Sequence, residues 1–86
     1  MHIILYSKQG CHLCEGLEEK LNLIDDVTLD IRDITSNEEW FNLYQYEIPV
    51  MYLVTAKGAV LIPRTSPRIS VNQLYKTLQN FVSVTN

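Results

Sequence analysis

Apolar and polar residues alternate in short blocks along this chain, and each block predicts one strand or helix. The first block, HIILY at residues 2–6, is a nearly continuous apolar run, which is typical of a strand buried on both faces. VTLDI at residues 27–31 alternates apolar and polar positions, as a half-buried strand does. Between these two blocks, apolar residues recur at helical spacing from His12 onward: Leu13, Leu17, Leu21 and Ile24.

The middle of the chain predicts a short helix. Ser36 and Glu39 have the spacing of a capping box, in which each side chain bonds to the backbone of the other residue. We therefore expect the helix to begin at Ser36, with Leu43 among its apolar residues. The aromatic residues of this region are expected to pack in the core rather than to form a substrate platform: Trp40, Phe41, Tyr44 and Tyr46.

The last third of the chain predicts a hairpin followed by a helix. Residues 50–54 and 59–62 are apolar runs, and Gly58 between them suits the backbone of a tight turn. Ser70 and Gln73 repeat the capping spacing ahead of a final helix. The apolar residues of this helix form one stripe: Val71, Leu74, Tyr75, Leu78, Phe81 and Val82.

The predicted order is strand, helix, strand, helix, strand, strand, helix (βαβαββα). The first two strands should be parallel, because a helix connects them, and the hairpin strands should be antiparallel. Helices on both faces of such a mixed sheet make an α/β sandwich. We expect residues 1–86 to form one domain, since this length supports a single small core.

Composition and charge narrow the functional class. The chain has 86 residues, of which 47% are hydrophobic and 20% are charged, and its formal net charge is −3. Its seven Lys and Arg residues never form a basic run, so we expect no nucleic-acid partner. The apolar runs are too short to span a membrane, and no signal peptide precedes the first strand, so we expect a cytoplasmic protein that works as a monomer.

Cys11 and Cys14 are the two cysteines of the chain and lie where the first strand turns into the first helix. Free N–H groups and the helix dipole at that turn favour the thiolate of Cys11, and Lys8 and His12 would add positive potential. Cys14 should be less exposed and hold its proton more firmly. An accessible thiolate beside a shielded thiol suits thiol–disulfide exchange, in which the first attacks and the second resolves.

Other readings of this pair remain open at the level of sequence. Both cysteines could be inert thiols in a reduced cell. A structural zinc site needs four ligands, and the chain offers only Cys11, Cys14, His12 and His2, so we expect no metal site within one chain. A binding module without catalysis, or a carrier of an iron–sulfur cluster shared between two chains through Cys11 and glutathione, are further alternatives.

The motif YSKQGCHLC at residues 6–14, the motif EIPVMYL at 47–53 and the order of elements resemble one known group of proteins. This group is the glutaredoxin-like branch of the thioredoxin superfamily, particularly its small members with a Cys-His-Leu-Cys site. The resemblance implies a thioredoxin-like fold with a four-stranded mixed sheet and three helices. It also implies that Cys11 is the attacking thiol and Cys14 the resolving thiol.

The resemblance extends to the surroundings of the cysteines. Pro49 matches a proline that is cis in this superfamily and faces the active site, although the residues alone favour a trans proline at the start of a strand. A cis bond would leave the Ile48 backbone free to pair with an extended peptide or glutathione. Lys8 matches a position that contacts a glutathione carboxylate, and Tyr6 is expected to line the site. His12 either stabilises the Cys11 thiolate or is an ordinary exposed residue of the first turn.

The electron donor stays open, because residues 62–70 contain no glycine where glutaredoxins that hold glutathione carry a Gly-Gly pair. We expect Arg64, Thr65 and Ser66 to form a solvated loop more than an anion site. The predicted function is a thiol–disulfide oxidoreductase that reduces protein or glutathione mixed disulfides. It needs no bound cofactor, and either glutathione or a dithiol reductase resets the cysteine pair.

Overall fold

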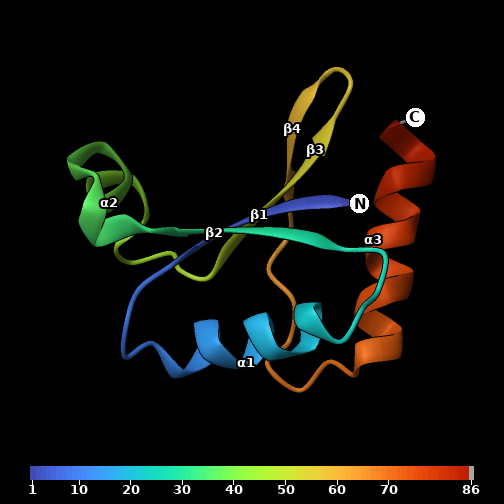
Figure 1. The fold of residues 1–86 in the computed structure, drawn as a ribbon, viewed down its shortest axis with the longest axis horizontal. Helices are drawn as coiled ribbons and strands as arrows, with labels where there is room; N and C mark the ends of the chain where they lie inside the picture. The colour runs from blue at the N-terminus through green and yellow to red at the C-terminus, as the bar shows by residue number, and fades with distance from the viewer. Residues whose placement is uncertain (86) are drawn as a thin grey trace.

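The computed structural model describes residues 1–85, with the side chains of residues 1–83, and has the predicted order of elements (Figure 1). The strands are β1 (His2–Ser7), β2 (Thr28–Asp33), β3 (Val50–Thr55) and β4 (Gly58–Ile62). The helices are α1 (His12–Asn22), α2 (Glu38–Tyr44) and α3 (Val71–Thr85), and a short 3-10 turn, η1 (Ile34–Ser36), precedes α2.

The four strands form one mixed sheet in the order β2-β1-β3-β4. β1 runs parallel to β2 and antiparallel to β3, and β3 pairs with β4 as an antiparallel hairpin. Gly58 has a φ of +119°, in the left-handed region that favours glycine, which confirms its predicted role at the hairpin turn. The fold is therefore the thioredoxin-like α/β arrangement that the sequence predicts.

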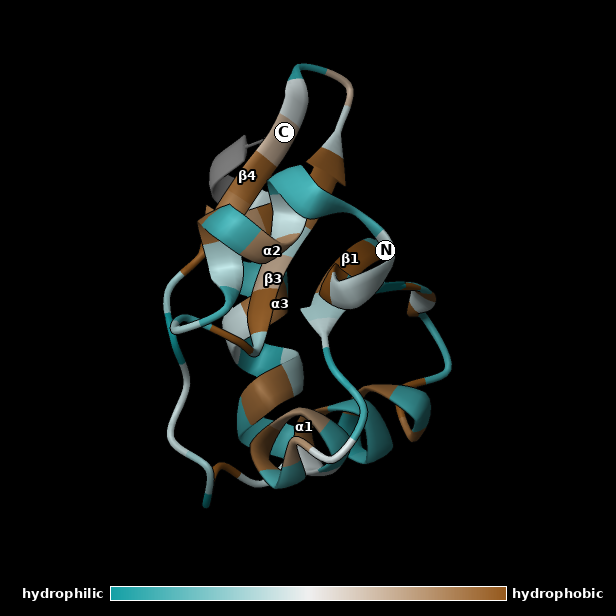
Figure 2. Cartoon of the chain, turned by 90° about the vertical axis from the view of Figure 1, so that its left-hand side faces the viewer, coloured by the Kyte–Doolittle hydropathy of each residue, from teal (hydrophilic) through white to brown (hydrophobic). Residues whose placement is uncertain are grey.

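β1 is the centre of the molecule, because its two faces pack into two separate cores. Ile3 and Leu5 are fully buried on the face covered by α1 and α3, together with Leu21 and Leu78 from those helices. The alternate residues of β1 pack toward α2 on the other face, against Ile34. In Figure 2 the strands are coloured mostly as hydrophobic, whereas the helices carry both hydrophilic and hydrophobic residues.

The start of α2 differs from the prediction by one residue. Asn37, rather than Ser36, caps the helix, and its side-chain oxygen accepts a hydrogen bond from the Trp40 N–H at 3.1 Å. Ser36 belongs to η1, and its hydroxyl donates to the Asp33 carbonyl at 2.6 Å. The 3-10 turn therefore uses the Ser36 side chain before the helix begins.

Leu13 and Tyr46, which were expected to pack in the core, are exposed, as is Leu43 on α2. The exposed fraction is 49% for Leu13, 57% for Leu43 and 87% for Tyr46. Leu13 lies on the first turn of α1, beside a surface cavity, and Tyr46 lies in the turn after α2 rather than in the helix. The remaining aromatic residues of α2, Trp40 and Phe41 among them, do pack on the second core.

The end of the chain follows its prediction closely. The Ser70 hydroxyl accepts a hydrogen bond from the Gln73 N–H at 3.1 Å, and the Gln73 side chain accepts one from the Ser70 N–H at 3.4 Å. This reciprocal pair starts α3, whose Leu74 and Leu78 are fully buried. Over the part of the chain that is described, no helix is both long and apolar enough to cross a membrane.

Candidate redox site

Cys11 and Cys14 lie at the start of α1 and are joined by a disulfide, with 5.3 Å between their Cα atoms. Cys11 is the N-cap residue, and its sulfur accepts a hydrogen bond from the Cys14 N–H at 3.3 Å. Cys14 is only 2% exposed, whereas Cys11 is partly exposed. The structure therefore places one accessible and one shielded sulfur on the first turn of the helix, in the oxidised state.

A tight turn between β1 and α1 sets the position of Cys11. The Cys11 N–H donates to the Lys8 carbonyl at 3.2 Å, and Gly10 has a φ of +82°. A residue with a Cβ rarely adopts that φ, so glycine suits the position immediately before the cysteine. The turn brings the chain from the end of the central strand directly into the capping position of α1.

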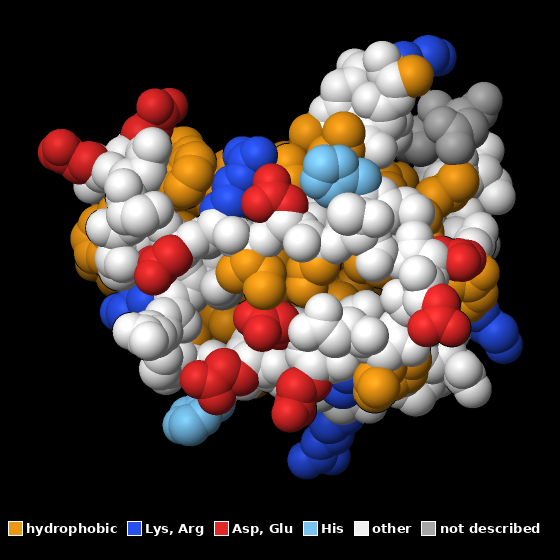
Figure 3. All heavy atoms as spheres, viewed as in Figure 1, with side chains coloured by type: hydrophobic (Ala, Val, Ile, Leu, Met, Phe, Trp, Pro, Cys, Tyr) orange, Lys and Arg blue, Asp and Glu red, His pale blue; other side chains and the backbone are white. Residues whose placement is uncertain are grey.

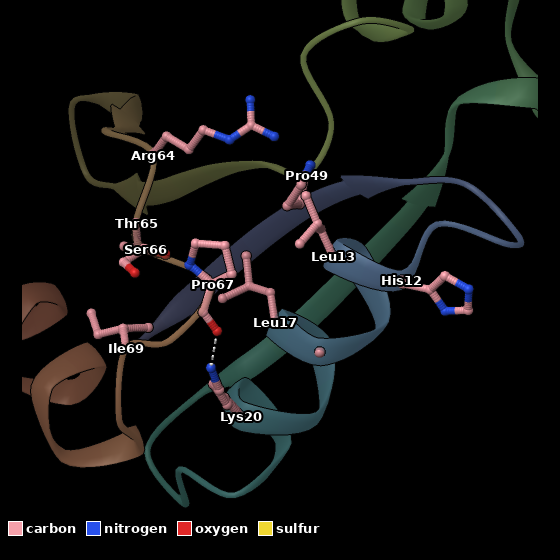
Figure 4. A pocket seen from close by; sticks show the side chains of 11 residues that line it. His12, Leu13, Leu17, Lys20, Pro49, Arg64, Thr65, Ser66, Pro67 and Ile69 are labelled. Atoms are coloured by element: carbon pink, nitrogen blue, oxygen red, sulfur yellow. Dashed lines mark hydrogen bonds between the residues drawn. The ribbon is translucent and has the colours of Figure 1, made fainter.

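The Ile48–Pro49 peptide bond is cis, as the resemblance implies and contrary to the expectation from residues alone. Pro49 and Leu13 line a cavity of about 100 Å³ between α1 and the loop that follows β4. In the close-up of this cavity, the Leu13 side chain points toward Pro49 (Figure 4). The cis proline is thus brought to the residues that directly follow Cys11.

The backbone of Ile48 is not free, which corrects the expectation that it is open to a bound peptide. Its N–H donates to the Tyr44 carbonyl at 3.1 Å, and its carbonyl accepts a hydrogen bond from the Arg64 guanidinium at 3.2 Å. Arg64 is exposed, as expected for a solvated loop, and its guanidinium reaches the carbonyl that precedes Pro49.

Tyr6 lies away from the cavities that border the cysteines. Its ring is buried in the second core, with its centroid 5.6 Å from that of Trp40 and 4.4 Å from that of Tyr44. Its hydroxyl accepts a hydrogen bond from Arg32 at 3.2 Å, and this bond is the main cause that raises the pKa of Arg32. The position of Tyr6 indicates a structural role rather than the predicted contact with substrate.

Lys8 lines a second cavity, of about 230 Å³, together with Cys14, Glu18 and Asp33. Asp33 accepts hydrogen bonds from the N–H and the hydroxyl of Thr35, at 2.8 and 2.7 Å. These bonds lower the pKa of Asp33, and the charge of Lys8 adds to the effect. Lys8 is therefore brought near the shielded cysteine, in a hollow where carboxylates outnumber cations.

His12 makes no contact that would hold it over the disulfide. Its side chain is 95% exposed, and its Nδ1 lies 3.8 Å from a carboxylate oxygen of Glu15. Figure 4 shows the imidazole pointing away from the cavity that its backbone borders. Of the two sequence interpretations, this geometry favours the ordinary exposed residue.

No group of three or more His, Cys, Asp or Glu side chains within the described residues is arranged to hold a metal ion. Acidic side chains do gather on the face shown in Figure 3, in the region where α1 and β2 lie. α1 has three carboxylates: Glu15 and Glu19 are exposed, and Glu18 is half-buried in the cavity that Lys8 and Cys14 line.

Two features of the site have no clear signal in the sequence. The exposed Arg64 contacts Ile48, and this contact joins residues that lie 16 positions apart in the chain. Leu13 was assigned to the core, because its spacing from Leu17 fits a buried stripe. The only sequence signal for Arg64 was its place in the loop where related proteins have glycines.

Comparison with known proteins agrees with this geometry. Residues 2–79 match the model of the family described as Glutaredoxin-like domain (DUF836). Thioredoxin 1 from the thermophilic eubacterium Thermosipho africanus is similar in structure, with a TM-score of 0.65 and 17% identity over 100% of this chain and 99% of that one. A structural genomics target protein from X. campestris has a TM-score of 0.64 and 20% identity over 91% of this chain and 96% of that one.

A third solved structure, of a malarial protein, has a TM-score of 0.59 and 15% identity over 92% of this chain and 93% of that one. Among curated proteins, none matches this chain. At these identities the solved structures bear on the fold alone, whereas the family model spans most of the sequence. The chain therefore belongs to the glutaredoxin-like domain family and has the fold of the thioredoxin superfamily.

Proposed function

We propose that the protein is a thiol–disulfide oxidoreductase that uses Cys11 and Cys14 to reduce protein or glutathione mixed disulfides. The observation that carries this proposal is the position of Cys11, whose sulfur caps α1 and accepts a hydrogen bond from the Cys14 N–H. A helix N-terminus stabilises a thiolate through its free N–H groups and its dipole. The same position therefore supports a reactive thiolate once the pair is reduced.

The proposed cycle begins with the reduced pair. The Cys11 thiolate attacks one sulfur of a substrate disulfide, a new bond to Cys11 forms, and the other sulfur leaves as a thiolate that takes up a proton. The Cys14 thiolate then attacks the Cys11 sulfur and displaces the second substrate thiol. Two electrons have passed to the substrate, and the protein is left with the Cys11–Cys14 disulfide seen in the structure.

Burial supports this division of roles. Cys14 is 2% exposed, so a bulky disulfide reaches it poorly, while the partly exposed Cys11 is open to attack from solvent. The distance between their Cα atoms, 5.3 Å, lies in the range of ordinary disulfides, so resolution requires no large backbone movement.

We propose further that an external thiol, either glutathione or the dithiol of a reductase, returns the two electrons, and that the protein holds no cofactor. Lys8 beside the pair is the residue that we assign to a substrate carboxylate, on the resemblance and on its place in the cavity that Cys14 lines. Pro49 and the residues around it border the side of the site where the substrate docks.

The proposal is tested by trapping the intermediate. Reduced Cys14→Ser protein mixed with a glutathione mixed disulfide should accumulate one glutathione on Cys11, because the resolving thiol is gone. The wild-type protein should pass to the internal disulfide, and Cys11→Ser should form no adduct under the same conditions. Mass spectrometry of the intact proteins distinguishes the three results, and equal adduct formation by both variants would contradict the assigned roles.

A further inference from the structure

The cavity beside Pro49 combines apolar walls with a cation at each end. Leu13, Leu17 and Ile69 are among the side chains that line it. Figure 4 shows Arg64 and Lys20 at opposite ends of this cavity, one near Pro49 and the other on the side of α1 away from the disulfide. None of the described residues that line the cavity is acidic.

Within the described side chains, neither of these cations has a carboxylate partner. Arg64 donates to the Ile48 carbonyl at 3.2 Å, and Lys20 donates to the Pro67 carbonyl at 2.8 Å. Among the side chains described, residues 1–83, the ion pairs are His12 with Glu15 and Arg32 with Asp30. Because a guanidinium has five N–H donors and an ammonium three, both groups keep donors available for an anion.

We propose that this cavity selects among substrates and that it prefers a polypeptide segment in which an apolar side chain is flanked by acidic residues. The proposal rests on the proposed function, since the segment is the one that brings its disulfide to Cys11. The apolar side chain would fill the space between Leu13 and Ile69. The flanking carboxylates would meet Arg64 and Lys20.

The exposed position of Leu13 supports a docked polypeptide. Leu13 is 49% exposed although it lies only two residues after Cys11, and a segment in the cavity would cover it. Removing such apolar surface from water favours binding. Glutathione has no apolar side chain to place against these walls, so a protein substrate fits the cavity better than glutathione does.

Arg64 also bears on how the segment is held. Its guanidinium donates to the Ile48 carbonyl, and the Ile48 N–H donates to the Tyr44 carbonyl, so a segment that paired with this backbone as a β-strand would have to displace the bond to Tyr44. The side chains of the segment, its carboxylates and its apolar residue, therefore carry the selectivity that we propose.

The experiment measures how fast the reduced protein reacts with peptides whose single cysteine carries a pyridyl mixed disulfide. Attack by Cys11 on the peptide sulfur forms the Cys11–peptide disulfide and releases pyridinethione, whose absorbance reports the step. One peptide has Leu flanked by Glu, a second has Leu flanked by Lys, and a third has Ser flanked by Glu. We expect the first to react about tenfold faster than the second, with each exposed charge pair contributing about threefold, and faster than the third.

Variants assign this preference to the two cations. Arg64→Gln and Lys20→Gln should each reduce the ratio between the Glu and Lys peptides by about threefold, and the double variant should bring it near one. Lys57→Gln, at the hairpin tip and distant from α1 (Figure 1), should leave the ratio unchanged. Raising the salt concentration should lower the wild-type ratio, because exposed charges are screened.

Several outcomes would overturn the inference. Equal rates for the Glu and Lys peptides, a preference that survives in the double variant, or a glutathione pyridyl disulfide that reacts faster than the Glu peptide would each do so. These results leave the proposed function intact, because pyridinethione is still released. If the folded, reduced protein releases none from any of the probes, the proposed function itself fails, and the inference with it.

Discussion

Cys11 combines two functions at one position, because it begins α1 and supplies the accessible sulfur of the disulfide. The hydrogen bond from the Cys14 N–H to the Cys11 sulfur ties the two cysteines together through the backbone as well as through the covalent bond. A thiolate in this place would replace the carboxylate or hydroxyl that usually caps a helix. The helix geometry and the proposed chemistry thus depend on the same residue.

At the scale of single residues, the sequence predicts features that depend on residues nearby in the chain. It does not predict contacts between segments that are distant in the chain. The spacing of Cys11 and Cys14 was enough to predict one accessible and one shielded thiol. The contact between Arg64 and Ile48 was not predictable, because it depends on the path of the loop after β4 across the cis proline. Tyr6 was misjudged since its neighbours in sequence lie near the cysteines while its ring faces the other core.

Asp33 provides a prediction about protonation near the shielded cysteine. Its pKa is lowered mainly by hydrogen bonds from Thr35, so Thr35→Val should raise that pKa toward the ordinary value by removing the hydroxyl donor. In the wild-type protein, a depressed carboxyl pKa stabilises the fold above the pKa of the unfolded chain, and this contribution is lost as the pH falls through the folded value. Carbon NMR titration of the Asp33 carboxyl in the wild-type protein and in the variant measures the two midpoints, and identical midpoints would show that the Thr35 hydroxyl is not a cause.

At the scale of the elements, hydrophobic periodicity placed every helix and strand, and the errors lie at the ends. The capping box at Ser70 and Gln73 forms as expected, with both reciprocal hydrogen bonds. The one at Ser36 did not, because η1 uses that hydroxyl and moves the start of α2 to Asn37. Adjacent Ser and Asn are both good caps, so the sequence pattern by itself does not choose between them.

Because Asn37 caps α2, the loss of its side chain should lower the stability of the protein more than the loss of the Ser36 hydroxyl does. Asn37→Ala should lower the free energy of unfolding by about 1 kcal/mol, because the Trp40 N–H loses its partner. Asn37→Asp should retain most of the stability, since aspartate caps a helix as well as asparagine does. Urea unfolding followed by circular dichroism measures these differences, and a larger loss for Ser36→Ala than for Asn37→Ala would restore the original prediction.

The whole molecule is organised around β1, which separates the core under α1 and α3 from the core under α2. The sequence predicted this division, because a nearly continuous apolar run such as residues 2–6 is typical of a strand that is buried on both faces. It did not predict which single leucines would face solvent. That depends on where each helix ends and on the cavity that α1 shares with the loop after β4.

Two leucines near the end of α1 test the position of the main core. Leu21 is fully buried, so Leu21→Ala should lower the free energy of unfolding by about 2–5 kcal/mol through lost burial and the cavity that it leaves. Leu23 is 70% exposed, and Leu23→Ala should change it by about 0.5 kcal/mol or less. Chemical unfolding of the two variants under one set of conditions provides the comparison, and similar losses would show that the helix is packed differently.

The central claim is that the capping position makes Cys11 the reactive thiolate of the pair. The most direct measurement is the pH dependence of alkylation in the reduced protein, with the modified cysteine identified by mass spectrometry. We predict that Cys11 is alkylated first and that its pKa lies well below the ordinary value of about 8.5, while the shielded Cys14 reacts slowly at neutral pH. A Cys11 midpoint at or above about 8.5, or faster alkylation of Cys14, would contradict the account.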